Sequence, residues 1–162
     1  MVSALTVAAG VTDPELPMLT LADLGVLRAV EEHDGRVVVS ITPTYTGCPA
    51  MDTMRDDLAH ALLTAGYSDV EIRTVLTPAW SSDWITDHGR QALADAGIAP
   101  PGPAPATGGP VPLTLGVTRR AVSCPLCGST DTGEISRFGA TACRALWRCR
   151  SCAEPFEYVK EI

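Results

Sequence analysis

The segment 97–112 is the feature that most limits how this chain can fold. Its 16 residues, GIAPPGPAPATGGPVP, include six prolines and four glycines. Proline lacks the backbone donor and glycine loses much conformational freedom on ordering, so such a segment forms neither a helix nor a central strand. We expect it to be an extended, semi-rigid linker. The 162-residue chain is therefore predicted to fold as two domains, over 1–96 and 113–162.

The charge of the chain is unevenly divided between these domains. Residues 1–100 carry a formal charge of −9, whereas residues 111–162 carry +2. Binding to nucleic acid depends on clustered cations, and an acidic major domain argues against it. We therefore expect no nucleic-acid partner.

The sequence also predicts a cytoplasmic protein. No apolar run approaches the roughly 18 residues that cross a membrane. The first 17 residues contain no lysine or arginine, so they lack the charged region of a signal peptide. In the cytoplasm, paired cysteines indicate metal binding more often than disulfides.

The pattern of residues 1–96 predicts an α+β domain, with a small three-stranded sheet covered by helices. Alternation and turn signals indicate strands, and apolar residues at three- and four-residue spacing indicate helices. The expected order is a helix starting at 12–15, strands at 26–31 and 36–42, a helix from 49 to 65, a strand at 69–76 and a helix at 82–96.

Two CxxC pairs, Cys124-x-x-Cys127 and Cys149-x-x-Cys152, are separated by 21 residues. Each pair can turn two thiolates toward one ion, and four thiolates complete a tetrahedral zinc site. A domain of some 40 residues with few large apolar side chains needs such a link. The pattern predicts a zinc ribbon in which four cysteines hold a structural zinc.

Two other interpretations of these four cysteines remain open, namely two disulfides and an iron–sulfur cluster. Cys143 is a fifth thiol in the same domain, which four-coordinate zinc does not require. It is either a small buried residue or an additional ligand.

Cys48 is the only cysteine among the first 123 residues, in the stretch TYTGCPAMD. Pro49 suits the first position of a helix, so Cys48 is predicted at a helix N-terminus, where the dipole favours a thiolate. Gly47 leaves the approach to the sulfur open, while the charge of Asp52 opposes the thiolate. A packed structural cysteine is the other interpretation.

Three stretches resemble motifs of the MIP18 family (domain of unknown function 59). They are Asp13-Pro14-Glu15, Leu24-Gly25-Val26, and Thr42-Pro43-Thr44 through Cys48-Pro49. The resemblance implies a small α/β fold and a role in the assembly or delivery of iron–sulfur clusters. In that family the cysteine of the T-x-x-x-C-P motif is implicated, which makes Cys48 the candidate for transfer of a cluster.

The succession of this domain, a Pro/Gly linker and a ribbon resembles the D-subunit family of phenylacetyl-CoA epoxidase systems. The resemblance includes Phe138-Gly139 and Cys143. It implies an accessory subunit in phenylacetate degradation, which matures the iron–sulfur cluster of the reductase or the metal site of the oxygenase. The implied partners are the other epoxidase subunits, especially the iron–sulfur reductase.

No self-sufficient active site is evident in the sequence. His33 adjoins a turn, His88 adjoins Gly89, and His60 lies on the predicted helix about 18 Å of rise from Cys48, too far for a dyad. A maturation factor is the favoured function, ahead of a structural subunit of the oxygenase complex and a ribbon that binds nucleic acid. If Cys48 holds a cluster, which normally has four ligands, a homodimer, Cys143 or a small molecule must supply the others.

Overall fold

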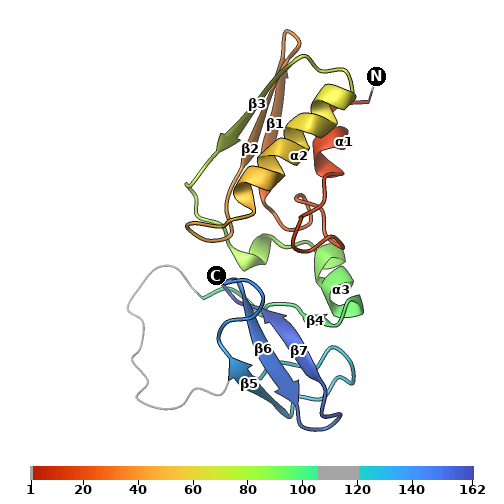
Figure 1. Cartoon of the computed structure of the whole chain (residues 1–162), viewed down its shortest axis with the longest axis vertical. Coiled ribbons are helices and arrows are strands. Elements are labelled where there is room, and N and C mark those ends of the chain that lie inside the picture. The colour runs from red at the N-terminus through yellow and green to blue at the C-terminus, as the bar shows by residue number, and fades with distance from the viewer. Residues whose placement is uncertain (1, 106–120) are drawn as a thin grey trace. The chain divides into compact units, whose positions relative to one another are not determined.

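The computed structural model describes residues 2–105 and 121–162 (Figure 1). By their contacts the residues form two compact units, Met1–Ala92 and Leu93–Ile162. The end of the predicted linker, 106–112, lies outside the described residues. Its beginning differs from the prediction, because Ile98–Ala99 form strand β4, which pairs with a strand of the second unit. The prolines begin only at residue 100, so Ile98 and Ala99 keep their backbone donors and are buried.

The first unit is the predicted α+β domain. Its sheet has the order β1-β2-β3, in which β2 runs antiparallel to β1 and parallel to β3. The elements of this unit are α1 (Ala4–Ala9), β1 (Leu27–His33), β2 (Arg36–Ile41), α2 (Met51–Thr64), β3 (Asp69–Thr74), the 3₁₀ helix η1 (Ser82–Trp84) and α3 (Asp87–Asp95), whose last residues belong to the second unit.

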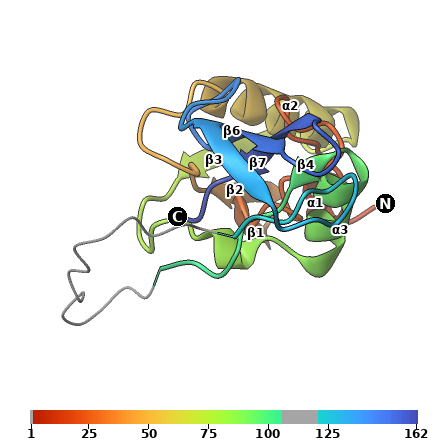
Figure 2. The ribbon, with the colours of Figure 1, turned by 90° about the horizontal axis from the view of Figure 1, so that it is seen from below.

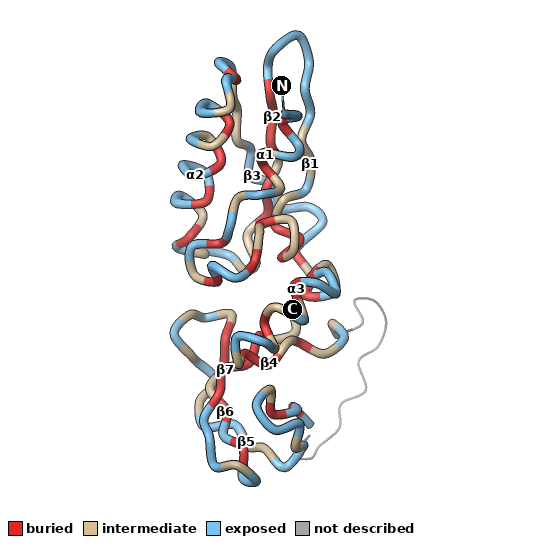
Figure 3. Tube along the Cα trace, turned by 90° about the vertical axis from the view of Figure 1, so that its right-hand side faces the viewer, coloured by how far each residue is buried: buried red, intermediate tan, exposed pale blue. Residues whose placement is uncertain are grey.

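The core of the first unit lies around the central strand β2, where Val37, Val39 and Ile41 are completely buried. The helix α2 contributes Met54, Leu58 and Leu62 at four-residue spacing, which is part of the predicted helical pattern. These residues form the red stripes along β2 and α2 in Figure 3. Burying each large apolar side chain contributes about 2 kcal/mol.

The helix predicted to start at residues 12–15 is absent. The carboxylate of Asp13 does accept from the backbone N–H groups of Glu15 and Leu16, at 2.8 and 2.7 Å, as a helix cap would. The chain then turns back, however, because Thr12 bridges to Thr20. Pro17 explains this difference, since the residue before a proline avoids the helical conformation. The first helix is α1 instead, which Ser3 caps through the N–H of Thr6.

The single helix predicted over 82–96 is two helices. Ile85 is extended between η1 and α3. The hydroxyl of Thr86 accepts from the N–H of Gly89 at 3.0 Å, so Thr86 caps a new helix and ends the preceding turn. None of the helices that the structure describes is long and apolar enough to cross a membrane.

The second unit is a four-stranded sheet in the order β4-β7-β6-β5, of which Figure 2 labels β4, β7 and β6. Its strands are β4 (Ile98–Ala99), β5 (Thr132–Ser136), β6 (Arg144–Cys149) and β7 (Pro155–Val159). Trp147 and Tyr158 meet edge to face in the core, with their ring centroids 5.8 Å apart. Val122 and Phe156 are buried in the same cluster. The core is small, as expected for a ribbon.

At Gly25 two loops of the first unit pack closely against each other. Its φ is +70°, and a Cβ at this position would lie 2.5 Å from the Cβ of Trp84. The neighbouring Leu24 carbonyl accepts from the indole N–H of Trp80 at 2.9 Å. The guanidinium of Arg28 lies 3.7 Å from the centre of the Trp84 ring, a cation–π contact. Only glycine permits this close approach.

Replacing Gly25 by alanine should therefore lower the free energy of unfolding of the first unit by about 3 kcal/mol, through both strain and overlap. Gly35→Ala is the matched control, because Gly35 has a φ of +84° and open space around its Cβ position. It should cost only about 1 kcal/mol. Urea unfolding followed through amide signals of residues 2–92 measures both. Equal losses would show that Trp84 does not restrict residue 25.

Candidate metal centre and the Cys48 loop

Four cysteines of the second unit come together. Cys124 and Cys127 lie in the loop before β5, Cys149 ends β6, and Cys152 lies in the turn that leads to β7. Their four sulfur atoms lie within 4.8 Å of one another. The two CxxC pairs therefore meet, as their spacing predicted.

The backbone around each pair explains this placement. Gly128 has a φ of +74°, and its N–H donates to the carbonyl of Cys124 at 2.9 Å, which closes the first turn. In the second pair, the N–H of Cys152 donates to the sulfur of Cys149 at 3.5 Å. Each turn directs two sulfur atoms to the same side.

The sulfur distances fit one tetrahedral ion. Bonds of about 2.3 Å from a central ion place tetrahedral thiolates about 3.8 Å apart. The observed separations are 3.8 Å between Cys124 and Cys152 and 3.6 Å between Cys127 and Cys149. A disulfide needs about 2.05 Å, so these cysteines are free thiols here. Several metal atoms in a cluster would hold the thiolates farther apart, so the geometry favours a single ion.

The thiols of this group differ in how readily they lose a proton. Hydrogen bonds from the backbone of Cys152 and Ser151 lower the pKa of Cys149 to about 6, against the effect of burial. The backbone of Ser129 acts to lower the pKa of Cys127, but the neighbouring thiols, led by Cys149, and burial raise it to about 12. Ion binding requires the thiolate form, so the ion must displace protons from this group.

Cys143 lies outside the four-sulfur group. Its sulfur is 3.0 Å from the hydroxyl of Thr141, which also accepts from the Nε of Arg144 at 3.0 Å. Arg144 is buried and pairs with Glu157 at 2.6 Å. This network fixes the loop before β6. The role of Cys143 as an additional ligand stays a prediction.

Cys48 is half-buried in the loop between β2 and α2. Its N–H donates to the carbonyl of Tyr45, and its own carbonyl accepts from Met51, at 3.3 and 3.4 Å. The helix α2 begins at Met51 rather than at Pro49, so its start was predicted two residues too early from the sequence. Gly47 has a φ of +86°, and no atom of the described residues lies within 4 Å of its Cβ position, so the space beside residue 47 is open.

Two features of this region escaped the sequence analysis. The hydroxyl of Thr42 is buried and has no hydrogen-bond partner in the described part of the chain. Leu76 is 68% exposed just beyond β3. The N–H of Val75 donates to the carbonyl of Ile41 at 2.8 Å, so the segments that follow β2 and β3 leave the sheet at the same edge. Apolar periodicity contains no signal for either feature.

All three histidines are exposed. His88 lies 3.1 Å from the carboxylate of Asp23. Burial acts to raise the pKa of Asp23, but hydrogen bonds from Thr20, His88 and Thr86 lower it to about 2. This network holds two loops of the first unit together.

Known proteins are similar to both units of the chain. Residues 4–74 match the family described as iron-sulfur cluster assembly protein, and residues 109–160 match the PaaD zinc beta ribbon domain. The putative D subunit of 1,2-phenylacetyl-CoA epoxidase from Escherichia coli (strain K12) is 41% identical over 157 residues, which cover 94% of this chain and 87% of that protein. The chain belongs to the D-subunit family of phenylacetyl-CoA epoxidase systems.

Other relatives of this D-subunit family member cover about half of the chain. An Fe-S protein maturation auxiliary factor of Porphyromonas gingivalis (strain ATCC BAA-308 / W83) is 33% identical over 80 residues, 48% of this chain and 75% of that protein. The crystal structure of a DUF59 domain from Bacillus anthracis has a TM-score of 0.52 at 26% identity, and the match covers 56% of this chain and 87% of that one. The resemblances to both families are thereby confirmed.

The metal centre of this D-subunit family member should hold one ion per chain. Cys124→Ser should lower the bound metal to well below one equivalent, whereas Cys143→Ser, the matched control outside the group, should keep it. Because ion binding supplies folding free energy, chelation should unfold β5–β7 and leave residues 2–92 folded. Metal analysis and amide spectra measure both effects. Equal metal loss in the two variants would contradict this assignment.

Proposed function

We propose that the chain is an accessory factor of a phenylacetyl-CoA epoxidase system, which assists maturation of the iron–sulfur cluster of the reductase or the metal site of the oxygenase. The observation that carries this proposal is the position of Cys48. Its thiol is half-buried, follows an open glycine, and lies in the unit that matches iron–sulfur cluster assembly proteins. The maturation factor of P. gingivalis aligns with this chain over 80 residues.

Cys48 would act as a transfer thiol. The cluster is the cargo, and its transfer exchanges ligands without oxidation or reduction. The Cys48 thiolate replaces a ligand of the donor at one iron, and a thiolate of the client then replaces Cys48. The proton lost by Cys48 on binding returns to it on release. An incompletely buried sulfur can take part in both exchanges, whereas a packed structural cysteine could not.

Cys48 alone cannot hold a cluster, because four ligands are normal. A second copy of the chain, Cys143 or a small thiol must complete the set. The ribbon would contribute differently, with a structural zinc at Cys124, Cys127, Cys149 and Cys152. Four thiolates at these distances leave no open position on the ion, which suits a structural site rather than a catalytic one.

The proposed partners are the other epoxidase subunits, above all the iron–sulfur reductase, in the cytoplasm. The E. coli relative is named as a subunit of the epoxidase, and the match to it covers 94% of this chain. A permanent structural subunit is the alternative. It would remain in the purified complex in a fixed ratio, whereas a maturation factor would bind and leave.

Cys48→Ser should remove the soft sulfur ligand with little change in volume, so the fold should survive. Cluster content of the reductase, and with it epoxidase turnover in cells, should fall at least about tenfold, because oxygen is a poor substitute for thiolate at iron. Zinc in the ribbon should not change. Thr46→Ser, an exposed change in the same loop, is the matched control.

Two outcomes would contradict this role for Cys48. One is normal turnover and reductase cluster content in cells that contain only Cys48→Ser. The other is unfolding of the variant, which would assign Cys48 to the core. Normal reductase cluster content combined with loss of the assembled complex would favour the structural alternative.

A further inference from the structure

The strand β3 forms one edge of the sheet of the first unit. In the order β1-β2-β3 only its inner side pairs with another strand, and Figure 1 shows β3 as the outermost strand of this sheet. Its pairing with β2 runs without a register shift from Asp69, opposite Arg36, to Thr74, opposite Ile41. The outer edge of β3 is therefore regular along its whole length.

The two edges of this sheet differ in how they are protected. Free edges are usually kept from pairing with other chains by a bulge, a proline or an inward-pointing charge. The strand β1 has such a bulge, a register shift between Leu27 and Ala29. The strand β3 contains neither a bulge nor a proline. It is therefore the edge that is open to a further strand.

The backbone of β3 directs alternate residues outward. The N–H of Val75 donates to the carbonyl of Ile41 at 2.8 Å, so residue 75 faces β2. Hydrogen-bonding direction alternates along a strand, so Val70, Ile72 and Thr74 direct their N–H and C=O groups to the outer side. In the part of the chain that the structure describes, no hydrogen bond uses these outer groups.

The side chains between these residues carry opposite charges. Glu71 accepts from the Nε of Arg73 at 2.6 Å and also from Arg36. These hydrogen bonds, led by the one from Arg73, lower the pKa of Glu71 to about 2, so Glu71 is negatively charged at neutral pH. The side chain of Arg73 remains 53% exposed. The edge thus presents a negative and a positive charge two positions apart.

This charge pattern selects one register for the pairing of β3 with its own copy. Two copies related by a two-fold axis run antiparallel, and their outward residues must form the hydrogen-bonded pairs. Around the middle of β3 the axis then passes residue 71, 72 or 73. A centre at Glu71 opposes two glutamates, and a centre at Arg73 opposes two arginines. Like charges directly opposite each other destabilise a sheet, whereas opposite charges stabilise it.

A centre at Ile72 satisfies both the backbone and the charges. Ile72 would exchange two hydrogen bonds with its own copy, and Val70 would pair with Thr74 on either side, so every outer N–H and C=O is used. Glu71 of each copy would lie opposite Arg73 of the other. Together with the pair inside each copy, these four side chains would form a square of alternating charges.

We propose that β3 is an interface for a second copy of this chain. The two β3 strands pair antiparallel around Ile72, and the two three-stranded sheets become continuous. The interface is independent of the role of Cys48. Because the copies run in opposite directions, their Cys48 loops lie at opposite ends of the joined sheet. This dimer therefore does not bring a second Cys48 to the same cluster.

The first test uses the full-length, metal-loaded protein without substitutions. Pairing along one strand buries little area, so the association should be reversible, with a dissociation constant below about 1 mM by sedimentation equilibrium. Amide hydrogen exchange at low and high protein concentration locates the interface. The amides of Val70, Ile72 and Thr74 should exchange more slowly as the fraction of dimer rises, whereas those of β1 should not change.

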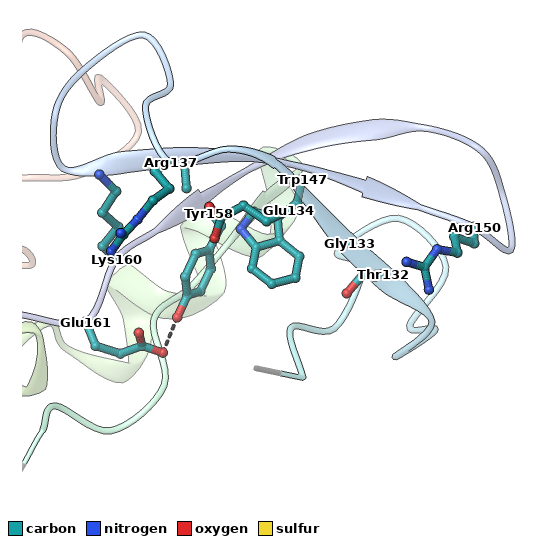
Figure 4. A pocket seen from close by; sticks show the side chains of 10 residues that line it. Thr132, Gly133, Glu134, Arg137, Trp147, Arg150, Tyr158, Lys160 and Glu161 are labelled. Carbon is teal, nitrogen blue, oxygen red and sulfur yellow. Dashed lines mark hydrogen bonds between the residues drawn. The ribbon is translucent and has the colours of Figure 1, made fainter. Parts of the chain in front are cut away.

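The second test reverses the charges. Arg73→Glu opposes only glutamates in the dimer and Glu71→Arg opposes only arginines, so each should raise the dissociation constant at least about tenfold. An equal mixture of the two variants should associate about as tightly as the original protein, because every arginine then faces a glutamate. Arg137→Glu is the matched control, an equal charge change at an exposed residue beyond β5 of the second unit (Figure 4). It should change association less than about twofold.

A protein that remains monomeric up to about 1 mM would overturn the proposal. So would slower exchange in dimers that is absent from β3, equal weakening by Arg73→Glu and Arg137→Glu, or a mixture that associates no better than its separate components. Amide spectra show whether each variant is folded. If one is not, the exchange measurement on the unsubstituted protein still decides.

Discussion

The parallel pairing of β2 with β3 determines where the first unit places Cys48. Val37 lies opposite Val70 and Ile41 opposite Thr74 in this pairing. Two parallel strands cannot be joined by a tight turn, so the chain must cross over through a helix, here α2. The loop that starts this crossover contains Cys48, and the segment after β3 leaves from the same edge of the sheet. Loops at the carboxyl ends of parallel strands are common sites of binding in α/β proteins.

The second unit depends on a different constraint, the convergence of four thiols. Its buried cluster consists of few large side chains, led by Trp147, Phe156 and Tyr158, which is a small core for a separate unit. The cysteines connect the loop before β5 to the turn after β6, and an ion there would hold these segments against each other. The network of Arg144, Glu157 and Thr141 fixes the opposite end of β6.

The sequence predicted those parts of the structure that local patterns encode. The run of valines in Arg36–Ile41 and the spacing of Met54, Leu58 and Leu62 each identified an element correctly, and the two CxxC pairs correctly predicted that four sulfur atoms meet. The prediction from sequence failed where a residue nearby in the chain overrides the signal for a helix. Asp13 caps as predicted, but Pro17 prevents the helix, and Thr86 caps a second helix inside a continuous apolar pattern. The free edge of β3 could not be predicted, because only the fold determines the order of the strands.

The claim that Cys48 receives a cluster is tested most directly by the iron and acid-labile sulfide that the chain binds. The full-length protein, incubated anaerobically with a cluster donor and re-purified, should contain iron and sulfide in equal amounts in addition to one zinc per chain. Cys48→Ser should contain the zinc alone. Iron and sulfide bound equally by both proteins would contradict the account, as would their absence from both.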